Sequence, residues 1–434
     1  MRRCATGLLL ALTLGSPTPA AQDLDRARAL LEQALAALKP APVAIATPAA
    51  LDQALAAAKP GDVLTLSPTL VYPAALTLKQ SITLQSTIPL SRMDRATPLP
   101  QFQSGLTIAG DDITLIGVQV THMNPLTDLV VIRGARVTLD RVRVLGDPAK
   151  GAKRGIAANG NGTITIRRSY VADCFGPYPG QDTQAIGAWD MAPGLVVEDN
   201  YLEGGSETIL LGGADPPSAD RTPRDVTIAR NTITKNPAWQ TRAVGVKNTL
   251  EIKNAIHVDI TENTIEYAWG GHGQDGYGLM LTTRNQDGRA PFSTIENVTI
   301  TANAFAHMAA AINVLGSDNL HPSGRLTTVT IATNTWTDVD PVTYTGSNRL
   351  ILVDRGPRAL TIRANTFAGR NIGSVVYFAG GPPAEDLAVV DNTWPPSKYG
   401  IFGNASTVAK AGALIPPAWP QYVLSGTLSG NRVQ

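Results

Sequence analysis

A short phrase containing one asparagine recurs through the second half of the chain at a nearly constant spacing. The phrase is apolar-x-apolar-x-x-Asn-x-apolar, as in residues 226–233, Val-Thr-Ile-Ala-Arg-Asn-Thr-Ile. Its asparagines are Asn200, Asn231, Asn263, Asn303, Asn334, Asn365 and Asn392. They are separated by 31, 32, 40, 31, 31 and 27 residues. A regular period of this length is typical of a solenoid, in which each period forms one coil.

These repeated positions have a physical explanation in a parallel β-helix. Stacked coils place equivalent residues about 4.8 Å apart, so the apolar positions form one continuous core. An inward asparagine at a turn can bond to the backbone and to the asparagine of the next coil, and asparagine tolerates the left-handed backbone of such a turn. Upstream, the same position is occupied by Ser169, Val142 and Val118. The asparagines are therefore expected to be structural.

The predicted fold class is all-β, a right-handed parallel β-helix of about ten coils between residues 80 and 394, with N-terminal capping helices. The right hand is expected because parallel crossover connections are almost always right-handed. Leucine-rich repeats are the main alternative solenoid, but these repeats lack the leucine frame and the helix that such repeats need.

The pattern before the first predicted strand is helical. Residues 23–39 place Leu24, Leu31, Leu35 and Leu38 on one face, and Pro40 ends this helix. Thr47 followed by Pro48 is typical of an N-cap and a first helical residue, and predicts a second helix through Ala58. Since a solenoid needs caps at its ends, we expect a helical N-terminal segment and cap at residues 22–62, the β-helix at residues 63–394, and a proline-rich C-terminal cap or tail without a further asparagine position at residues 395–434.

The N-terminus has the layout of a secretory signal peptide. Arg2 and Arg3 precede the apolar residues 8–14, and the small residues 18–21 supply a cleavage site. We therefore expect a signal peptide at residues 1–21 and an exported protein, either periplasmic or secreted. No later apolar run reaches membrane-spanning length, so no membrane insertion is expected. Cleavage leaves Cys174 as the single cysteine, which predicts a buried packing role and no internal disulfide.

Composition excludes several other classes. The chain has 36 Lys and Arg against 35 Asp and Glu, and no basic stripe of the kind that nucleic-acid binders show. With 43% hydrophobic and only 16% charged residues, it is not a disordered chain. The 40 glycines and 31 prolines do not suit a helical bundle. We expect a monomer that does not bind nucleic acid.

The first coil carries a resemblance to a known superfamily. Residues 51–66, Leu-Asp-Gln-Ala-Leu-Ala-Ala-Ala-Lys-Pro-Gly-Asp-Val-Leu-Thr-Leu, are similar to the corresponding segment of exported pectate-lyase-like β-helix proteins. Together with the asparagine coils, the resemblance covers roughly residues 47–394. It implies the fold but not one reaction, because that superfamily contains lyases, hydrolases, epimerases, esterases and non-catalytic adhesins.

A second strand of each coil can be aligned through its own motif. Residues 209–215 match residues 312–318, and the corresponding stretches of the coils between and before them are 250–254, 279–285 and 185–190. Alternate residues of a strand face the same way. If Leu250 and Ile252 point into the core, the outer surface gathers Asp190, Asp215, Glu251, Lys253, Arg284 and Asp318.

The loops beside these strands add candidate substrate-binding residues. The 40-residue coil carries its excess around residues 269–277, a glycine-rich loop with His272 and Asp275 that suits a groove wall. Trp239 can form a sugar-stacking platform or pack under a loop. Residues 246–254 and 283–288 resemble exported β-helix proteins of unknown activity. The predicted substrate-binding residues are Asp190, Trp239, Lys247, Asn254, His272, Asp275, Asn285 and Asp318.

The chain also resembles the alginate lyase and chondroitinase B branch of the superfamily. That branch has a Gly-x-x-Glu-Thr-Ile run, an acidic strand ending in Lys, and an Arg one coil later, which match residues 204–209, Glu251 to Lys253, and Arg284. The resemblance implies β-elimination on an acidic polysaccharide, with Lys253 as the base and Arg284 neutralising the carboxylate. Asp215 and Glu251 are the predicted ligands of a calcium ion. The Glu251–Lys253 spacing is shorter than in that branch, and its second acidic ligand is missing.

Two other functions stay open from the sequence. A hydrolase could draw its acid and base from Asp190, Asp215 and Asp318. The polygalacturonase branch of the superfamily is matched only in His272-Gly273, because its Arg-x-Lys motif is absent. A non-catalytic polysaccharide-binding or surface protein is the third possibility. We expect a polysaccharide lyase acting on a uronate-containing glycan.

Overall fold

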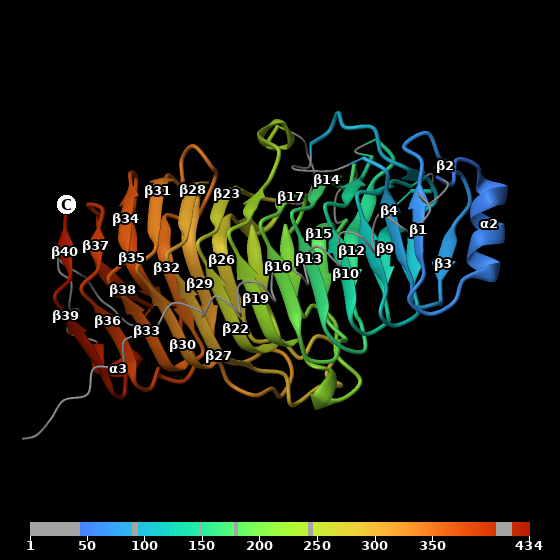
Figure 1. Ribbon diagram of the computed structural model, residues 1–434. Helices are drawn as coiled ribbons and strands as arrows, with labels where there is room; N and C mark the ends of the chain where they lie inside the picture. The colour runs from blue at the N-terminus through green and yellow to red at the C-terminus, as the bar shows by residue number, and fades with distance from the viewer. Residues whose placement is uncertain are drawn as a thin grey trace, which may run out of the picture. The chain divides into compact units, whose positions relative to one another are not determined.

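Nearly every repeat of the sequence forms three short strands, and equivalent strands of successive repeats pair in parallel (Figure 1). The computed structural model describes residues 44–88, 94–122, 124–125, 127–147, 149–177, 181–241, 246–404 and 419–434, with only the backbone of residues 419 and 420. The expected signal peptide and the expected helix at residues 23–39 lie outside the described residues. Three parallel sheets, A, B and C, run through the described ranges.

Sheet A contains 13 strands, β1 (Val63–Leu66), β4 (Thr83–Ser86), β7 (Thr114–Ile116), β10 (Val137–Asp140), β13 (Ile164–Arg167), β16 (Leu195–Glu198), β19 (Arg224–Ala229), β22 (Ala255–Thr261), β27 (Ile295–Thr301), β30 (Thr327–Ala332), β33 (Arg358–Arg363), β36 (Leu387–Val390) and β39 (Gly426–Ser429) in the described part of the chain. Sheet B contains 13 strands there, β2 (Val71–Tyr72), β5 (Gln101–Phe102), β8 (Gln119–Val120), β11 (Arg143–Leu145), β14 (Tyr170–Cys174), β17 (Tyr201–Gly204), β20 (Thr232–Thr234), β23 (Thr264–Ala268), β28 (Ala304–Met308), β31 (Thr335–Val339), β34 (Thr366–Gly369), β37 (Thr393–Trp394) and β40 (Arg432–Val433).

Sheet C contains 12 strands within the same ranges, β3 (Leu76–Leu78), β6 (Leu106–Ile108), β9 (Thr127–Ile132), β12 (Ala152–Ala158), β15 (Gln184–Ala188), β18 (Ile209–Leu211), β21 (Leu250–Ile252), β26 (Tyr277–Thr282), β29 (Ala310–Leu315), β32 (Arg349–Asp354), β35 (Ser374–Phe378) and β38 (Ile401–Gly403). A separate antiparallel hairpin joins β24 (Gly270–Gly271) and β25 (Gln274–Asp275). The short helices are α3 (Trp419–Tyr422) and the 3₁₀ helices η1 (Ala219–Arg221) and η2 (Pro237–Trp239).

This arrangement confirms the predicted right-handed parallel β-helix and corrects its extent. The described ranges contain more coils than the predicted ten, because the first coils carry no asparagine and the last has a glycine at the first apolar position of its phrase. Residues 395–434 are not only a cap or tail, since β39 pairs with β36 and β40 with β37. Asn431 accepts hydrogen bonds from the backbone N of Asn392 at 3.0 Å and from its Nδ2 at 3.1 Å. The phrase Leu428-x-x-Asn431-x-Val433 was present in the sequence, 39 residues after Asn392.

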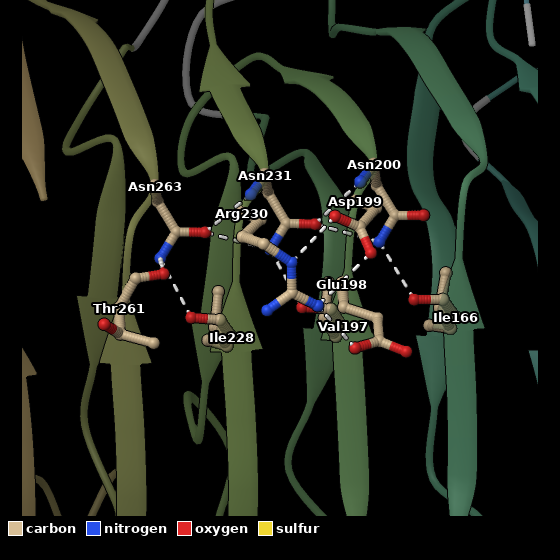
Figure 2. A network of polar contacts seen from close by, with 10 residues as sticks. All are labelled: Ile166, Val197, Glu198, Asp199, Asn200, Ile228, Arg230, Asn231, Thr261 and Asn263. Carbon is tan, nitrogen blue, oxygen red and sulfur yellow. Dashed lines mark hydrogen bonds and ion pairs between the residues drawn. The ribbon is translucent and has the colours of Figure 1, made fainter. Parts of the chain in front are cut away.

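The asparagines form a hydrogen-bonded ladder at the turn between sheets A and B (Figure 2). Asn231 is representative, since its backbone N and its Nδ2 both donate to Oδ1 of Asn263, at 2.9 and 3.0 Å. Its Nδ2 also donates to the carbonyl oxygen of Val197 at 2.8 Å. Ser169 extends the ladder upstream, because its Oγ accepts from the backbone N of Val142 at 3.0 Å. From Asn200 to Asn431, the polar groups of this buried turn are thus satisfied by an asparagine side chain in each coil.

The left-handed residue of this turn is not the asparagine but the residue before it. Asp199, Arg230 and Glu262 have φ values of 58°, 56° and 57°. The expectation that the asparagine itself adopts this backbone is therefore wrong. The preceding residue makes the bend, which turns the asparagine side chain inward. Arg230 faces out instead and pairs with Asp199 at 2.9 Å (Figure 2), an exposed contact that adds little stability.

Aromatic side chains fill the apolar position after the asparagine in the later coils. Phe305 stacks on Trp336 with ring centroids 4.5 Å apart, and Trp336 stacks on Phe367 at 4.5 Å. Trp394 continues the row at 4.8 Å from Phe367. All four are buried. Equivalent aromatic side chains of successive coils therefore stack on one another, which fixes the register of neighbouring coils and buries apolar area.

The predicted second helix is confirmed as α2 (Pro48–Ala57), which lies at the end of the stack beside β1 to β3 (Figure 1). Thr47 is its N-cap, with Oγ1 accepting from the backbone N of Ala50 at 3.3 Å. Leu51 is buried in the core, and Asp52 accepts a hydrogen bond from the Tyr72 hydroxyl at 2.7 Å. The helix therefore covers the first coil. No helix of the described ranges is long and apolar enough to cross a membrane.

Cys174 lies in β14 and is fully buried in the core, as expected. Burial raises the pKa of its thiol well above the ordinary value. A protonated, inaccessible thiol has no nucleophilic role.

Candidate functional site

The outer face of sheet C carries charged residues at the predicted register. Ile209, Leu250, Leu279 and Ile312 are paired across β18, β21, β26 and β29, as the motif alignment predicted. Leu250 and Ile252 belong to the core. Glu251 lies between them and so points to the opposite side of the strand, and Lys253 follows on that side.

Five charged side chains gather around this point and are called here the carboxylate–lysine cluster. They are Glu207, Lys235, Lys247, Glu251 and Lys253. Lys253 Nζ lies 3.6 Å from Glu251 Oε1, and Lys247 Nζ lies 3.2 Å from Glu207 Oε1. The carboxylates are the inner part, because the Glu207 and Glu251 side chains are 0% and 2% exposed. Lys247 and Lys253 are 24% and 16% exposed, so two ammonium groups face solvent above two buried carboxylates.

Neutral side chains complete the bonding of the buried carboxylates. Gln184 Nε2 donates to Glu207 Oε2 at 2.7 Å, and Asn248 Nδ2 donates to Glu251 Oε2 at 2.9 Å. Lys247 Nζ also contacts Asp182 at 2.6 Å. Each carboxylate thus has one oxygen bonded to a neutral side-chain amide, and its other oxygen faces a lysine.

Burial and mutual charge shift the pKa values of this cluster. Burial raises the pKa of Glu207, and the nearby Glu251 carboxylate raises it further. Burial lowers the pKa of Lys235 to about 7, against the opposing pull of Glu207 and Glu251. Burial alone would lower the pKa of Lys247, but Glu207 and Asp182 more than offset it and raise that pKa. Perturbed groups of both signs at one point are typical of functional sites.

Lys235 was missed by the sequence analysis. It follows β20, and its Nζ donates to the carbonyl oxygens of Gly205 and Ser206, both at 2.8 Å. Residues 204–209 were matched as a motif, but no role was assigned to Glu207. No sequence signal marks the partnership, because stacking of β20 on β17 brings Lys235 beside the turn that carries Glu207.

Arg284 lies on the coil after Lys253, and its backbone N donates to the Lys253 carbonyl oxygen at 2.9 Å. Its guanidinium, with a side chain 29% exposed, contacts Asp318 Oδ1 at 3.4 Å and also Asn319. Burial would raise the pKa of Asp318, but the backbone N–H groups of Leu320 and Asn285 lower it. Asp318 therefore positions Arg284 and its own loop. This corrects the prediction that Asp318 binds substrate.

Three further predicted residues are used within loops. Asp215 Oδ2 accepts from the backbone N of Asp287 and of Arg289, both at 2.9 Å. Asn254 is buried and donates to Ser293 Oγ at 3.2 Å, while its Oδ1 accepts from the backbone N of Thr294. Asn285 is buried, donates to the Pro322 carbonyl at 2.7 Å and accepts from the backbone N of Ala290. Asn254 and Asn285 are thus structural, which corrects their predicted binding role.

The predicted calcium ligands do not form a ligand set. Asp215 is committed to the loop at residues 287–289, whereas Glu251 contacts Asn248 and Lys253. In the part of the chain that the structure describes, no group of three or more His, Cys, Asp or Glu side chains is placed to hold a metal ion.

Trp239 corrects another prediction. It is buried, and its ring stacks on Phe175 with centroids 4.4 Å apart. It cannot offer a sugar-stacking face, and packs instead in a small buried apolar cluster with Phe175 and Val246. The extra residues of the 40-residue coil form the β24–β25 hairpin, in which His272 is exposed and Asp275 is half-buried. The backbone N of Gly270 anchors this hairpin to the Tyr344 carbonyl at 2.8 Å.

Asp190 lies apart from the carboxylate–lysine cluster, just beyond β15. Arg221 Nε pairs with Asp190 Oδ1 at 2.6 Å. Asp190 and Arg221 line a groove of about 450 Å³ together with Trp189 and Arg133.

Comparison with known proteins supports the fold. No protein-family model matches the chain, and no curated protein matches it. Among solved structures, it is similar to a mannuronic acid specific polysaccharide family 6 lyase from human gut microbiota, with a TM-score of 0.52 and 11% identity over 88% of this chain and 90% of that one. This likeness shows the parallel β-helix fold that the pectate-lyase-like resemblance implied.

Two other solved structures overlap the chain at lower scores. The Dettilon tailspike protein gives a TM-score of 0.47 and 13% identity over 82% of this chain, which spans 64% of the tailspike chain. The A-module of a mannuronan C-5 epimerase from Azotobacter vinelandii gives 0.42 and 15%, over 89% of this chain and 94% of that one.

Proposed function

We propose that this protein is a carbohydrate-active enzyme that cleaves an acidic, uronate-containing polysaccharide by β-elimination, outside the cytoplasm. The observation that carries the proposal is the contact of Lys253 with the buried Glu251 on the outer face of sheet C, 3.6 Å apart. Lys247 is held by a second buried carboxylate, and Arg284 lies on the next coil. A carboxylated sugar beside Lys253 meets two cations there, Lys247 and Arg284.

These residues have distinct roles in the proposed reaction. Lys253, as the neutral amine, removes the proton from the carbon next to the sugar carboxylate. Lys247 and Arg284 stabilise the negative charge that develops on that carboxylate, because cations in a partly desolvated site act strongly on developing charge. Glu251 holds the Lys253 amine in place through their 3.6 Å contact.

The reaction needs no water and no redox partner. The C–H bond breaks as the N–H bond to Lys253 forms, and the electron pair becomes a carbon–carbon double bond while the glycosidic C–O bond breaks. The departing oxygen takes the proton back from Lys253. One product then carries an unsaturated uronide and the other a free hydroxyl.

Calcium does not fit this site. Hard cations of this kind take six or more oxygen ligands. Here Lys247 and Lys253 already contact the two buried carboxylates, and Asp215 is bonded to backbone N–H groups. Lys247 and Arg284 supply positive charge where a metal would otherwise do so, and we propose a reaction without calcium.

Hydrolysis by paired aspartates is less well supported. Asp190 is paired with Arg221, and Asp318 is nearly fully buried within its loop. Asp215 Oδ2 accepts two backbone hydrogen bonds. None of the three presents a free carboxylate opposite another, which an acid and base pair requires.

Ultraviolet absorbance of unsaturated uronide tests the proposal. The purified protein is incubated with alginate, polygalacturonate and chondroitin sulfate, alginate first because a similar structure is a mannuronic acid specific lyase. Absorbance should rise with one of them. Lys253→Arg keeps the charge but loses the base, so the rate should fall about 10²- to 10⁴-fold while binding survives.

Lys79→Arg, at an exposed lysine in another coil, is the matched control and should not change the rate. An unchanged rate in Lys253→Arg would refute the assignment of the base. New reducing ends without absorbance would instead indicate hydrolysis. Binding without either signal would leave a polysaccharide-binding protein.

A further inference from the structure

The groove beside Asp190 lies outside the carboxylate–lysine cluster, and the proposed reaction does not use it. It has a volume of about 450 Å³. Val131 in β9 and Ala157 in β12 contribute small apolar surface, and Trp189 follows β15. The groove therefore crosses three successive strands of sheet C, which follow one another along the stack in Figure 1.

Trp189 is fixed in this groove by contacts on both its backbone and its ring. Asn159 Oδ1 accepts from the backbone N of Trp189 at 3.0 Å and of Asp190 at 3.2 Å. The guanidinium of Arg154 lies over the indole, 4.2 Å from its centroid, and Asp128 holds that guanidinium at 3.1 Å. The tryptophan remains partly exposed. It is an anchored aromatic surface with an arginine on one face.

Gly187 makes room for this stack. A Cβ atom at Gly187 would lie 3.0 Å from Arg154 Cδ and 3.6 Å from Trp189 Cζ3. A larger residue would push the arginine off the indole. The absence of a side chain at Gly187 is thus part of the construction of the platform.

Among the described residues that line the groove, one cation is unpaired. Arg221 is neutralised by the Asp190 carboxylate. Its Nη2 also donates to the backbone carbonyl oxygen of Asp190 at 2.7 Å. Arg154 is neutralised by Asp128. Arg133, directly after β9, is exposed, and its guanidinium makes no hydrogen bond or ion pair with any residue that the structure describes. It is available to bind an anion.

The groove is in line with Lys253 along the sheet. Ala188, Leu211 and Ile252 are register partners in β15, β18 and β21, so Trp189, Gly212 and Lys253 follow at the same level. Strands lie about 4.8 Å apart, which puts Trp189 about 10 Å from Lys253 along the sheet. Gly212, at φ 89°, places no side chain between them. A polysaccharide lying across the strands can contact both.

We propose that this groove is a binding subsite for a carboxylated sugar of the same chain that is cleaved at Lys253. A sugar ring packs its apolar face on Trp189, and its carboxylate pairs with Arg133. The subsite rests on the proposed function for its substrate class, and predicts that the enzyme acts on long rather than short oligosaccharides.

Binding without turnover tests the subsite separately from the reaction. Calorimetry with the Lys253→Arg protein compares a uronic acid hexamer with its carboxyl-reduced, neutral counterpart. Arg133→Gln should weaken binding of the acidic hexamer about tenfold or more, and leave the neutral one unchanged. Trp189→Ala should weaken both. Arg136→Gln, at an exposed arginine that pairs with Asp112 instead, is the matched control.

The subsite would be refuted if adding Arg133→Gln or Trp189→Ala to the Lys253→Arg protein left its affinity for the hexamers unchanged, whatever the absorbance assay shows. The absence of any binding would also refute it. A tenfold loss in Arg133→Gln without absorbance from the unmodified protein would keep the subsite and refute the elimination reaction. Circular dichroism of each variant excludes loss of the fold as the cause.

Discussion

Lys235 Nζ lies 2.8 Å from the carbonyl oxygen of Ser206, the residue before the buried Glu207. The buried amine of Lys235 therefore fixes the turn that presents one of the two carboxylates of the cluster. Lys235 does not face the solvent and so cannot contact a polysaccharide. We describe it as a positioning residue.

The pH dependence of stability should report on Lys235. Its folded pKa is lowered to about 7 from 10.5. Between these values the unfolded chain binds a proton that the folded chain does not, so the free energy of unfolding rises with pH, by at most about 1.4 kcal/mol per pH unit. Lys235→Met should flatten this slope in urea unfolding between pH 8 and 10. The exposed Lys79→Met should keep it, and an equal slope in all three proteins would contradict the prediction.

Removal of one asparagine from the ladder should destabilise two coils at once. Asn263 Oδ1 accepts from the backbone N and the Nδ2 of Asn231, and its own Nδ2 donates to Asn303 at 2.9 Å. Asn263→Ala leaves buried donors unsatisfied, which costs about 1–3 kcal/mol for each such group. We expect a loss of about 2–4 kcal/mol in urea unfolding. Thr264→Ala, at the exposed neighbouring position, should change it little; similar losses would argue against the ladder.

Trp239 and Trp189 should respond differently to truncation. Trp239 is buried against Phe175, so Trp239→Ala removes a packed ring and should cost roughly 3 kcal/mol. Trp189 is partly exposed, and Trp189→Ala should cost clearly less. Thermal unfolding of the two variants compares them. A greater loss for Trp189 would mean that the assignment of packing and binding roles is reversed.

A chelator should not change the proposed activity. The lysines of the carboxylate–lysine cluster contact the carboxylates that a calcium ion would need. EDTA should leave the rate of absorbance increase unchanged, and added calcium should not raise it. A loss with EDTA that calcium restores would show that a metal acts at this site after all.

The sequence by itself determined most of the coils and their register, although it placed residues 185–190 one residue out of register, since Ile186 and not Ala185 pairs with Ile209. The asparagine phrase identified the turn between sheets A and B, and the pairing of Ile209, Leu250, Leu279 and Ile312 followed from their motifs. The prediction succeeds because each coil repeats one pattern of inward apolar residues, so the spacing along the sequence also determines which residues stack on one another. The last coil was overlooked because Gly426 stands at the first apolar position of its phrase, although Leu428, Asn431 and Val433 occupy the other positions.

Only the tertiary structure decided which polar side chains meet. Lys235 reaches Ser206, Trp189 packs on Arg154, and Trp239 turns inward, all through loops or strand ends that follow no repeat. The position of such a side chain depends on contacts with neighbouring coils rather than on its own spacing. A strand pattern fixes which way a residue points, but whether it ends exposed, paired or buried depends on the loops that pack over it.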